Sequence, residues 1–431
     1  MSSDALISND RQAREIAGTV AELDGALSSE QILRSIMAGL PHEVVEAVRR
    51  SFLAERHELA DALRAFSAAK SGEYESIRDR AGNDPGAFLI VARIMRGLSQ
   101  KDLARKLGLR EQAIQRWESE KYRSITLSNY QKVAQTLGVR LRLDELRPRG
   151  DWEYTYDVTT DDLMKVVRHA RGHKWLDGQD QEDEKAISTL VRLVGDHVSR
   201  YGTPSLLRTG LKTVDRAQDW SLLSWKAQVT RRAERVIEEA RPKYRPINLS
   251  WLIDLVRLSV LDDGPRRAQE LLLEHGIVLV IEAHIKGVPF DGASFRADDI
   301  PVIGMTICRD SIDNFWFTLL HEVAHVILHY RTGLSAGFFD DLAFEELDDL
   351  EQEANSFAGS LLIPTEAWVR SPARIAKSPE PIEKFANLLG IHPAIVFGRI
   401  RMERKNYSIF SNKIGQGLVR KQFLSDEGFP L

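Results

Sequence analysis

Apolar residues in the first 80 positions recur at steps of three and four, the spacing of one face of a helix. A capping box at Ser28 and Gln31 precedes the first run, and Pro41 opens the next helix, where its missing N–H does no harm. The second helix carries its apolar seam at Val45, Val48, Phe52, Leu59, Ala62 and Phe66. The pattern predicts a helical arm over residues 1–80. The seam fits either a face packed inside the protein or a dimerisation surface.

Two short helical runs around a glycine follow within residues 86–142. The first run, residues 100–107, stops at Gly108, a residue type that adopts the left-handed conformation after a last helical turn. The second run, residues 111–119, begins after Leu109 has filled the turn. Two short helices joined in this way predict an all-α helix-turn-helix domain.

The remainder of the chain has two parts with different patterns. Residues 150–245 show helical periodicity with polar interruptions and predict a helical middle region of unknown role. Beyond them, the β-branched runs at 276–283 and 301–308 predict strands among helices. Strands and helices in one segment indicate an α+β domain over residues 247–405, followed by a C-terminal tail at 406–431.

The composition is that of a globular protein in a reducing compartment. Hydrophobic residues make up 43% and charged residues 28% of 431 positions, so we expect a multidomain, mostly α protein. One cysteine, Cys308, excludes an internal disulfide framework and a multi-cysteine zinc ribbon. The sequence contains neither the run of about 20 apolar residues that spans a bilayer nor the apolar core of a signal peptide. We therefore expect a cytoplasmic protein with no membrane partner.

Charge is distributed unevenly around the predicted helix-turn-helix. The whole chain has a formal net charge of −4, whereas residues 85–140 hold 11 Lys and Arg against 4 Asp and Glu, a local balance of +7. Such a contrast favours a face that binds phosphates. The side chains expected to read base edges are Gln112, Gln115 and Arg116. Phosphate contacts are predicted for Gln100 and Lys101.

The pattern LSQKDLARKLGLREQAIQRWE, residues 98–118, resembles the XRE-type, lambda-repressor-like helix-turn-helix. The resemblance implies binding to a double-stranded DNA operator. Folds of this kind usually bind as dimers on two half-sites, so a homodimer is expected. The helical arm could then serve as its dimerisation surface. A helix-turn-helix that serves as a protein-interaction module is the alternative.

A second candidate functional region is FTLLHEVAHVILHY, residues 317–330, which contains an HExxH motif. On a helix, His321 and His325 lie one turn apart on the same side, the separation at which two imidazoles can hold one zinc ion. His329 lies about 12 Å along the helix from His321, at about 1.5 Å per residue, so one ion cannot bind all three. His329 is therefore expected in the core or in an outer hydrogen bond to a ligand.

A third ligand is expected from LEQEANSFAGSLLIP, residues 350–364. If this run is helical, Glu351 lies about 50° from the centre of its apolar stripe and Glu353 about 110° from it. Glu351 therefore borders the buried face and is the candidate ligand, whereas Glu353 is predicted to point toward solvent. Asn355, one turn after Glu351, is placed to hold a ligand by a hydrogen bond.

Together, FTLLHEVAHVILH and EQEANSFAGSLLIP are similar to the ImmA/IrrE (M78) family of metallopeptidases, over about residues 250–400. The resemblance implies a zincin-like domain in which Zn²⁺ is held by His321, His325 and Glu351. It also implies that Glu322 is the general base, beside the open coordination position. A structural or degenerate metal site is the alternative, and a buried helix with incidental histidines is another.

A second helix-turn-helix pattern appears near the end of the chain. The run FANLLGIHPAIVFGRI, residues 385–400, aligns with residues 103–118, and Gly390 matches Gly108. The apolar Phe397 and the adjacent glycine make base reading improbable. This segment is expected to be a structural cap on the peptidase domain or a docking surface for a substrate.

These features predict a DNA-binding transcriptional regulator fused to a zinc-dependent endopeptidase. Relatives of the peptidase cut helix-turn-helix repressors and so switch on stress or mobile-element genes. The expected substrate is accordingly a repressor-type partner or the chain itself. The alternative function is a non-proteolytic, antitoxin-like repressor whose zinc domain is degenerate or sensory.

Overall fold

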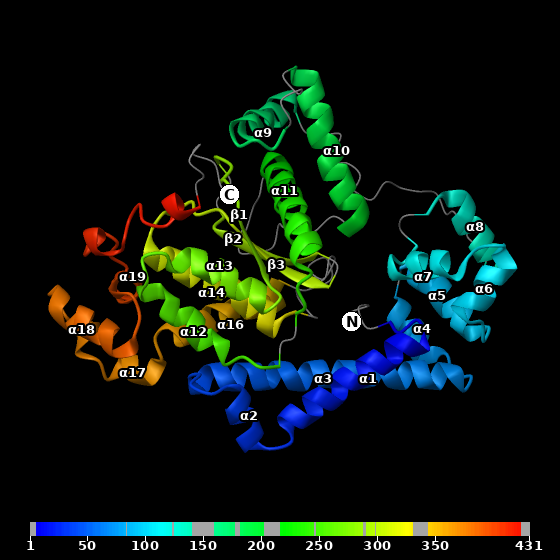
Figure 1. The fold of residues 1–431 in the computed structure, drawn as a ribbon, viewed down its shortest axis with the longest axis horizontal. Coiled ribbons are helices and arrows are strands. Elements are labelled where there is room, and N and C mark those ends of the chain that lie inside the picture. Colours follow the sequence, from blue (N-terminus) through cyan, green and yellow to red (C-terminus); the bar gives the residue numbers. More distant parts are fainter. Residues whose placement is uncertain are drawn as a thin grey trace. The chain divides into compact units, whose positions relative to one another are not determined.

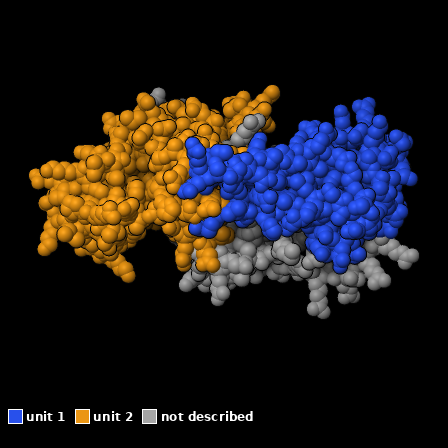
Figure 2. Space-filling view, turned by 90° about the horizontal axis from the view of Figure 1, so that it is seen from below, with its two compact units in different colours: residues 1–33, 50–153, 198–202 blue, residues 34–49, 154–197, 203–431 orange. Residues whose placement is uncertain are grey.

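The computed structural model divides the chain into two compact units, which are described separately (Figure 2). Unit 1 is made of residues 1–33, 50–153 and 198–202, and unit 2 of the remaining residues. The structure describes residues 6–82, 84–122, 125–139, 159–176, 182–201, 216–244, 247–287, 290–297, 299–330 and 344–423. The expected multidomain, mostly α fold is confirmed. Within the described residues, no helix has the length and apolar character that crossing a membrane requires.

The N-terminal region consists mainly of helices, as predicted, but it is not a separate unit. The boundary between the units passes through two of its helices, α2 and α3. The helices are α1 (Asp10–Leu27), α2 (Glu30–Ile36), α3 (His42–Lys70) and α4 (Glu75–Ala81). The predicted capping box is wrong by one residue, because α1 extends to Leu27 and Ser29 Oγ, not Ser28, accepts from the Ile32 N–H at 3.2 Å.

The helix-turn-helix lies in unit 1 and forms for local reasons. Ser99 and Asp102 form a reciprocal capping box at the start of α6, and Gly108 ends that helix in the left-handed conformation at φ 67°. Leu109 N–H then donates to Ala104 O at 2.9 Å. The helices are α5 (Pro85–Met95), α6 (Gln100–Leu107), α7 (Glu111–Ser119) and α8 (Leu127–Thr136).

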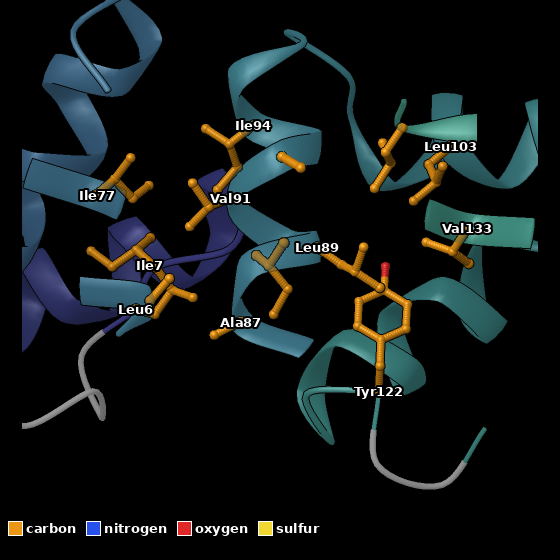
Figure 3. Packing of buried hydrophobic residues seen from close by; sticks show 14 of the residues in the cluster. Leu6, Ile7, Ile77, Ala87, Leu89, Val91, Ile94, Leu103, Tyr122 and Val133 are labelled. Atoms are coloured by element: carbon orange, nitrogen blue, oxygen red, sulfur yellow. The ribbon is translucent and has the colours of Figure 1, made fainter. Parts of the chain in front are cut away.

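The core of unit 1 extends beyond the helix-turn-helix itself. Leu6 and Ile7, which precede α1, are buried in the same cluster as Ile77, Val91 and Leu103 (Figure 3). The segment before α1 therefore packs as part of the helix-turn-helix core. Because burial of apolar surface stabilises a fold, these two residues help to hold the segment before α1 in this core.

A buried ion pair crosses this core. Arg93 on α5 forms a bidentate pair with Glu118 on α7, at 2.5 Å from Nε to Oε1 and 2.7 Å from Nη2 to Oε2. Gln100 Nε2 donates to Glu118 Oε2 at 2.7 Å, and Arg93 Nη2 also donates to Ser8 O at 2.6 Å. The pair thus connects α5, α6 and α7 to the segment before α1.

Unit 2 is built on a three-stranded sheet with strand order β1-β3-β2. The strands are β1 (Val278–Ile281), β2 (Gly292–Ala297) and β3 (Ile300–Met305); β1 and β3 are parallel, and β2 and β3 are antiparallel. The sequence pattern predicted β1 and β3. It missed β2, whose glycine- and alanine-containing sequence lacks a β-branched run.

Helices cover both faces of this sheet (Figure 1). Neighbouring residues of β2 point to opposite faces: Ser294 contacts Glu322 on α14 (Ile312–Leu328), and Phe295 lies under Lys226 on α11 (Arg216–Ala240). Gly304 on β3 allows α11 to approach, because an added Cβ would lie 2.6 Å from the ring of Trp225. The sheet is therefore a layer between α14 and α11.

The middle region contributes to this same unit rather than forming a separate domain. Glu282, which follows β1, is buried and accepts hydrogen bonds from Trp175 Nε1 at 3.1 Å and Arg232 Nη1 at 3.2 Å. These contacts attach α11, and the segment after α9, to the end of the sheet. The elements of the region are α9 (Thr160–Gly172), α10 (Asp183–Tyr201) and α11. The predicted boundary near residue 247 thus does not coincide with the division into units.

The C-terminal helices form a second helix-turn-helix against α14. Gly390 has φ 67°, and Ile391 N–H donates to Ala386 O at 3.1 Å, as in the first one. Phe397 is buried, and a Cβ at Gly398 would lie 2.7 Å from Asp313 on α14. The remaining helices of unit 2 are α12 (Trp251–Arg257), α13 (Gly264–Glu274), α16 (Phe344–Leu362), α17 (Thr365–Val369), α18 (Pro379–Leu389) and α19 (Pro393–Glu403).

The described part of the predicted tail packs on the segment that leads into α14. Ile312 N–H donates to Ile414 O at 3.0 Å. Asp310 Oδ1 accepts from the N–H groups of Val419 and Arg420 at 3.1 and 3.0 Å. Residues up to 423 are therefore part of unit 2, and they hold the start of the helix that carries the HExxH motif.

Candidate metal centre

Two packed helices bring the candidate ligands together. His321 and His325 lie one turn apart on α14, whose other faces are buried by apolar side chains such as Leu319 and Val323. Glu351 lies on α16, which packs along α14. His321, His325 and Glu351 form a group whose ligand atoms all lie within 4.8 Å of one another. Among the described residues it is the one group of this kind.

The distances within the group match one metal ion. His321 Nε2 lies 3.1 Å from His325 Nε2, and the Glu351 oxygens lie 3.3 and 3.4 Å from these two nitrogens. A tetrahedral zinc site with bonds of about 2.0–2.1 Å places its ligand atoms about 3.3–3.4 Å apart. The three residues therefore fit a zinc ion through Nε2, Nε2 and a carboxylate oxygen, and a fourth position is left for a water molecule or substrate.

The electrostatics of the group suit metal binding. Burial opposes charge on Glu351, but its close contacts with the imidazoles of His321 and His325 outweigh burial and hold the pKa of Glu351 well below its ordinary value. The carboxyl group is therefore ionised at neutral pH, as a metal ligand must be. The side chains of His321 and His325 remain 15% and 13% exposed, so the group is accessible from solvent.

Glu322 is held in place from the sheet. Its side chain is buried, and Ser294 Oγ on β2 donates to its carboxylate. The same hydroxyl lies 3.1 Å from Glu322 O. Gly292, two residues earlier, leaves space for this side chain, because an added Cβ would lie 3.0 Å from Glu322 Oε1. Ser294 and Gly292 were not predicted from the sequence, although a glycine inside a strand often marks a close approach.

The predicted outer residues contact the ligands. Asn355 Oδ1 lies 3.1 Å from His321 Nδ1, and His329 Nδ1 lies 3.0 Å from His325 Nδ1. His329 is the C-cap residue that follows α14, and it is buried. These contacts use the ring nitrogens that face away from Glu351, so they leave both Nε2 atoms toward it.

One prediction about this region is wrong. Glu353 was expected to point to solvent, but its Oε2 lies 3.2 Å from His329 Nε2. The helical projection considered only α16. His329, the residue directly after α14, approaches Glu353 from the side that the projection assigned to water.

The predicted DNA-contacting residues do not all lie at the surface. Lys101, Gln112, Gln115 and Arg116 are exposed on α6 and α7. Gln100, in contrast, is buried, and its amide group donates to Glu118. This placement argues against the predicted phosphate contact of Gln100, because its donor is used within the core.

Two family models match separate parts of the chain. Residues 89–143 match the family model described as Helix-turn-helix, and residues 274–392 match the model described as IrrE N-terminal-like domain. The second match contains the whole candidate metal group and Glu322. No curated protein and no solved structure matches the chain. Both resemblances noted in the sequence are confirmed, and so is their fusion in one chain.

Proposed function

We propose that this chain, which joins a helix-turn-helix to an IrrE N-terminal-like domain, is a DNA-binding transcriptional regulator with a zinc-dependent endopeptidase activity. Cleavage of a repressor-type partner, or of the chain itself, switches gene expression. The observation that carries the proposal is the spacing of the ligand atoms of His321, His325 and Glu351, with Glu322 adjacent to the first of them.

Each residue has a distinct part in the proposed hydrolysis. His321, His325 and Glu351 would hold a zinc ion, which would supply Lewis acidity toward a water molecule and the scissile carbonyl. Glu322 takes a proton from the attacking water and returns it to the leaving amide nitrogen, so that the C–N bond breaks and water is added across it. Ser294 keeps the carboxylate of Glu322 in one orientation by its hydrogen bond.

The DNA-binding part of the proposal rests on exposed residues of α6 and α7. Gln112, Gln115 and Arg116 read base edges, and Lys101 contacts phosphate. We further propose that the protein acts in the cytoplasm as a homodimer, since helix-turn-helix proteins read paired half-sites. Size determination with and without operator DNA tests the dimer.

A cleavage assay tests the peptidase. Full-length protein with stoichiometric zinc is incubated alone and with a helix-turn-helix repressor encoded by a neighbouring gene, and the products are read by mass spectrometry. We expect a discrete fragment that disappears in Glu322→Gln and on chelation. Glu366→Gln makes the same chemical change at an exposed position and should cleave normally. Intact substrate in every wild-type incubation under inducing conditions argues against the peptidase.

A non-proteolytic repressor with a sensory zinc domain is the second candidate. The observation in its favour is that Glu322 is only 6% exposed and that its carboxylate is already engaged by Ser294. The two functions differ in cells. Under this second function, regulation persists in Glu322→Gln and is lost in His325→Ala. Under the peptidase function, regulation is lost in both variants.

A further inference from the structure

A chain of contacts runs from the candidate metal group through His329 to Glu353 on α16. It begins at His325, whose Nε2 lies toward Glu351. The other ring nitrogen, Nδ1, lies 3.0 Å from Nδ1 of His329. Nε2 of His329 then lies 3.2 Å from Oε2 of Glu353. His329 is almost fully buried, at 3% exposure, so both of its ring nitrogens depend on these partners.

The direction of the hydrogen bonds follows from the chemistry of the end group. A carboxylate accepts and does not donate, so His329 donates to Glu353 from Nε2–H. A neutral imidazole has one donor and one acceptor, so Nδ1 of His329 accepts. His325 must therefore donate from Nδ1–H, and its Nε2 carries a lone pair. The carboxylate at one end thus selects the tautomer of His325 that can bind a metal ion.

The second ligand histidine is controlled separately. Asn355 Oδ1 lies 3.1 Å from Nδ1 of His321 and accepts its N–H, which likewise leaves Nε2 free. This acceptor is a different side chain from Glu353, which contacts His329. α16 therefore supplies one ligand and two independent hydrogen-bond acceptors, at residues 351, 353 and 355.

We propose that Glu353 and His329 are positioning residues that orient His325 for metal binding by this relay. The proposal deepens the proposed function, because it rests on the metal site formed by His321, His325 and Glu351. Such outer partners fix ring orientation and raise ligand basicity, and their loss typically weakens metal affinity by about 10- to 100-fold.

Zinc affinity of the full-length protein, measured by competition with a chromogenic chelator, tests the relay. We expect Glu353→Ala to weaken zinc binding by about 10- to 100-fold. Glu353→Gln retains an acceptor oxygen and should recover part of that loss. Gln352→Ala changes the exposed neighbour on α16 and should bind as the wild type does.

A double-mutant cycle separates the relay from general damage. His329→Phe keeps a ring in the buried position but removes both nitrogens. If both residues act through one hydrogen bond to His325, the Glu353→Ala/His329→Phe protein should bind zinc no more weakly than the weaker single variant. Asn355→Ala acts on His321, so its effect should add to that of Glu353→Ala. The visible absorption of bound Co²⁺ should change in the relay variants and not in Gln352→Ala.

Several results would overturn the relay. Wild-type zinc affinity in Glu353→Ala and His329→Phe would do so and would leave the proposed peptidase intact. The relay is also overturned if the metal-free variants melt at a lower temperature while their zinc affinity is unchanged. Glu353 and His329 would then have a purely structural role. Additive effects of Glu353 and His329 would also contradict it. If the wild type binds no zinc, the relay and the proposed function fail together.

Discussion

The buried pair between Arg93 and Glu118 offers the sharpest test of how the helix-turn-helix unit is held together. In Glu118→Ala, the guanidinium of Arg93 stays buried, with a side chain only 4% exposed, and loses both bonds of the bidentate pair. Gln100 loses its acceptor as well. Breaking a buried ion pair from one side costs about 3–5 kcal/mol, because an uncompensated charge remains. We expect a loss of that size in unit 1.

Hydrogen exchange read by mass spectrometry measures this loss in each unit separately. A loss of about 3–5 kcal/mol should speed exchange in peptides from α5 to α8 by about two to four orders of magnitude, at roughly tenfold per 1.4 kcal/mol. Peptides from β1 to β3 should be unchanged. Glu120→Ala, at an exposed neighbouring position, should cost under about 1 kcal/mol.

A double variant distinguishes the effect of the unpaired charge from a simple loss of packing. Arg93→Met/Glu118→Leu removes both charges and keeps apolar volume, so it should recover much of the stability that Glu118→Ala loses. A loss below about 1 kcal/mol in Glu118→Ala would refute the argument from an uncompensated charge. So would a double variant less stable than Glu118→Ala.

Three further results are expected. Gly292→Ala should lower the cleavage rate and leave zinc content unchanged, because the new Cβ lies 3.0 Å from Glu322 Oε1; equal loss of zinc in a metal assay would contradict this. Arg116→Ala should cost about 1–3 kcal/mol in operator binding with relaxed specificity, whereas Lys101→Ala should weaken all sequences alike and reduce the salt slope by about 1, both read by titration of labelled DNA. Burial lowers the pKa of Lys226 from its ordinary value of 10.5 to about 7. Between these two pH values the folded protein therefore binds fewer protons than the unfolded chain. Stability should therefore rise with pH across that window, by up to about 1.4 kcal/mol per pH unit. Lys226→Met should flatten this slope in urea unfolding series, and an unchanged slope would show that another group produces it.

Local features of the site were accessible from the sequence. The positions of His321 and His325 on one side of α14 follow from the helical period. The end of α6 follows from Gly108, and the match to an IrrE N-terminal-like domain confirms the region that the motif indicated. These features depend on residues within about one or two turns of each other, so the pattern of the sequence contains what is needed.

The two helix-turn-helix patterns show which features a local sequence pattern can predict and which it cannot. Both form, with left-handed glycines at φ 67° in each turn. In the first, Gln115 and Arg116 are exposed, whereas the aligned Phe397 is buried and Gly398 lies against Asp313 on α14. The similar turns reflect local hydrogen bonds. Which face is open to DNA depends on whether another helix covers it, and the pattern of either segment does not contain that information.

Helical period, capping and backbone preference act between near neighbours, so the amino-acid pattern was enough to predict the helical regions, two of the three strands, both turn glycines and the spacing of the HExxH histidines. Three features became visible in the folded protein: Ser294 contacts Glu322 from the sheet, Gln100 is buried, and Glu353 contacts His329. Each of these contacts joins residues from different elements. Whether these residues come into contact depends on how whole helices and strands pack together. That packing is a property of the entire core and not of any one segment.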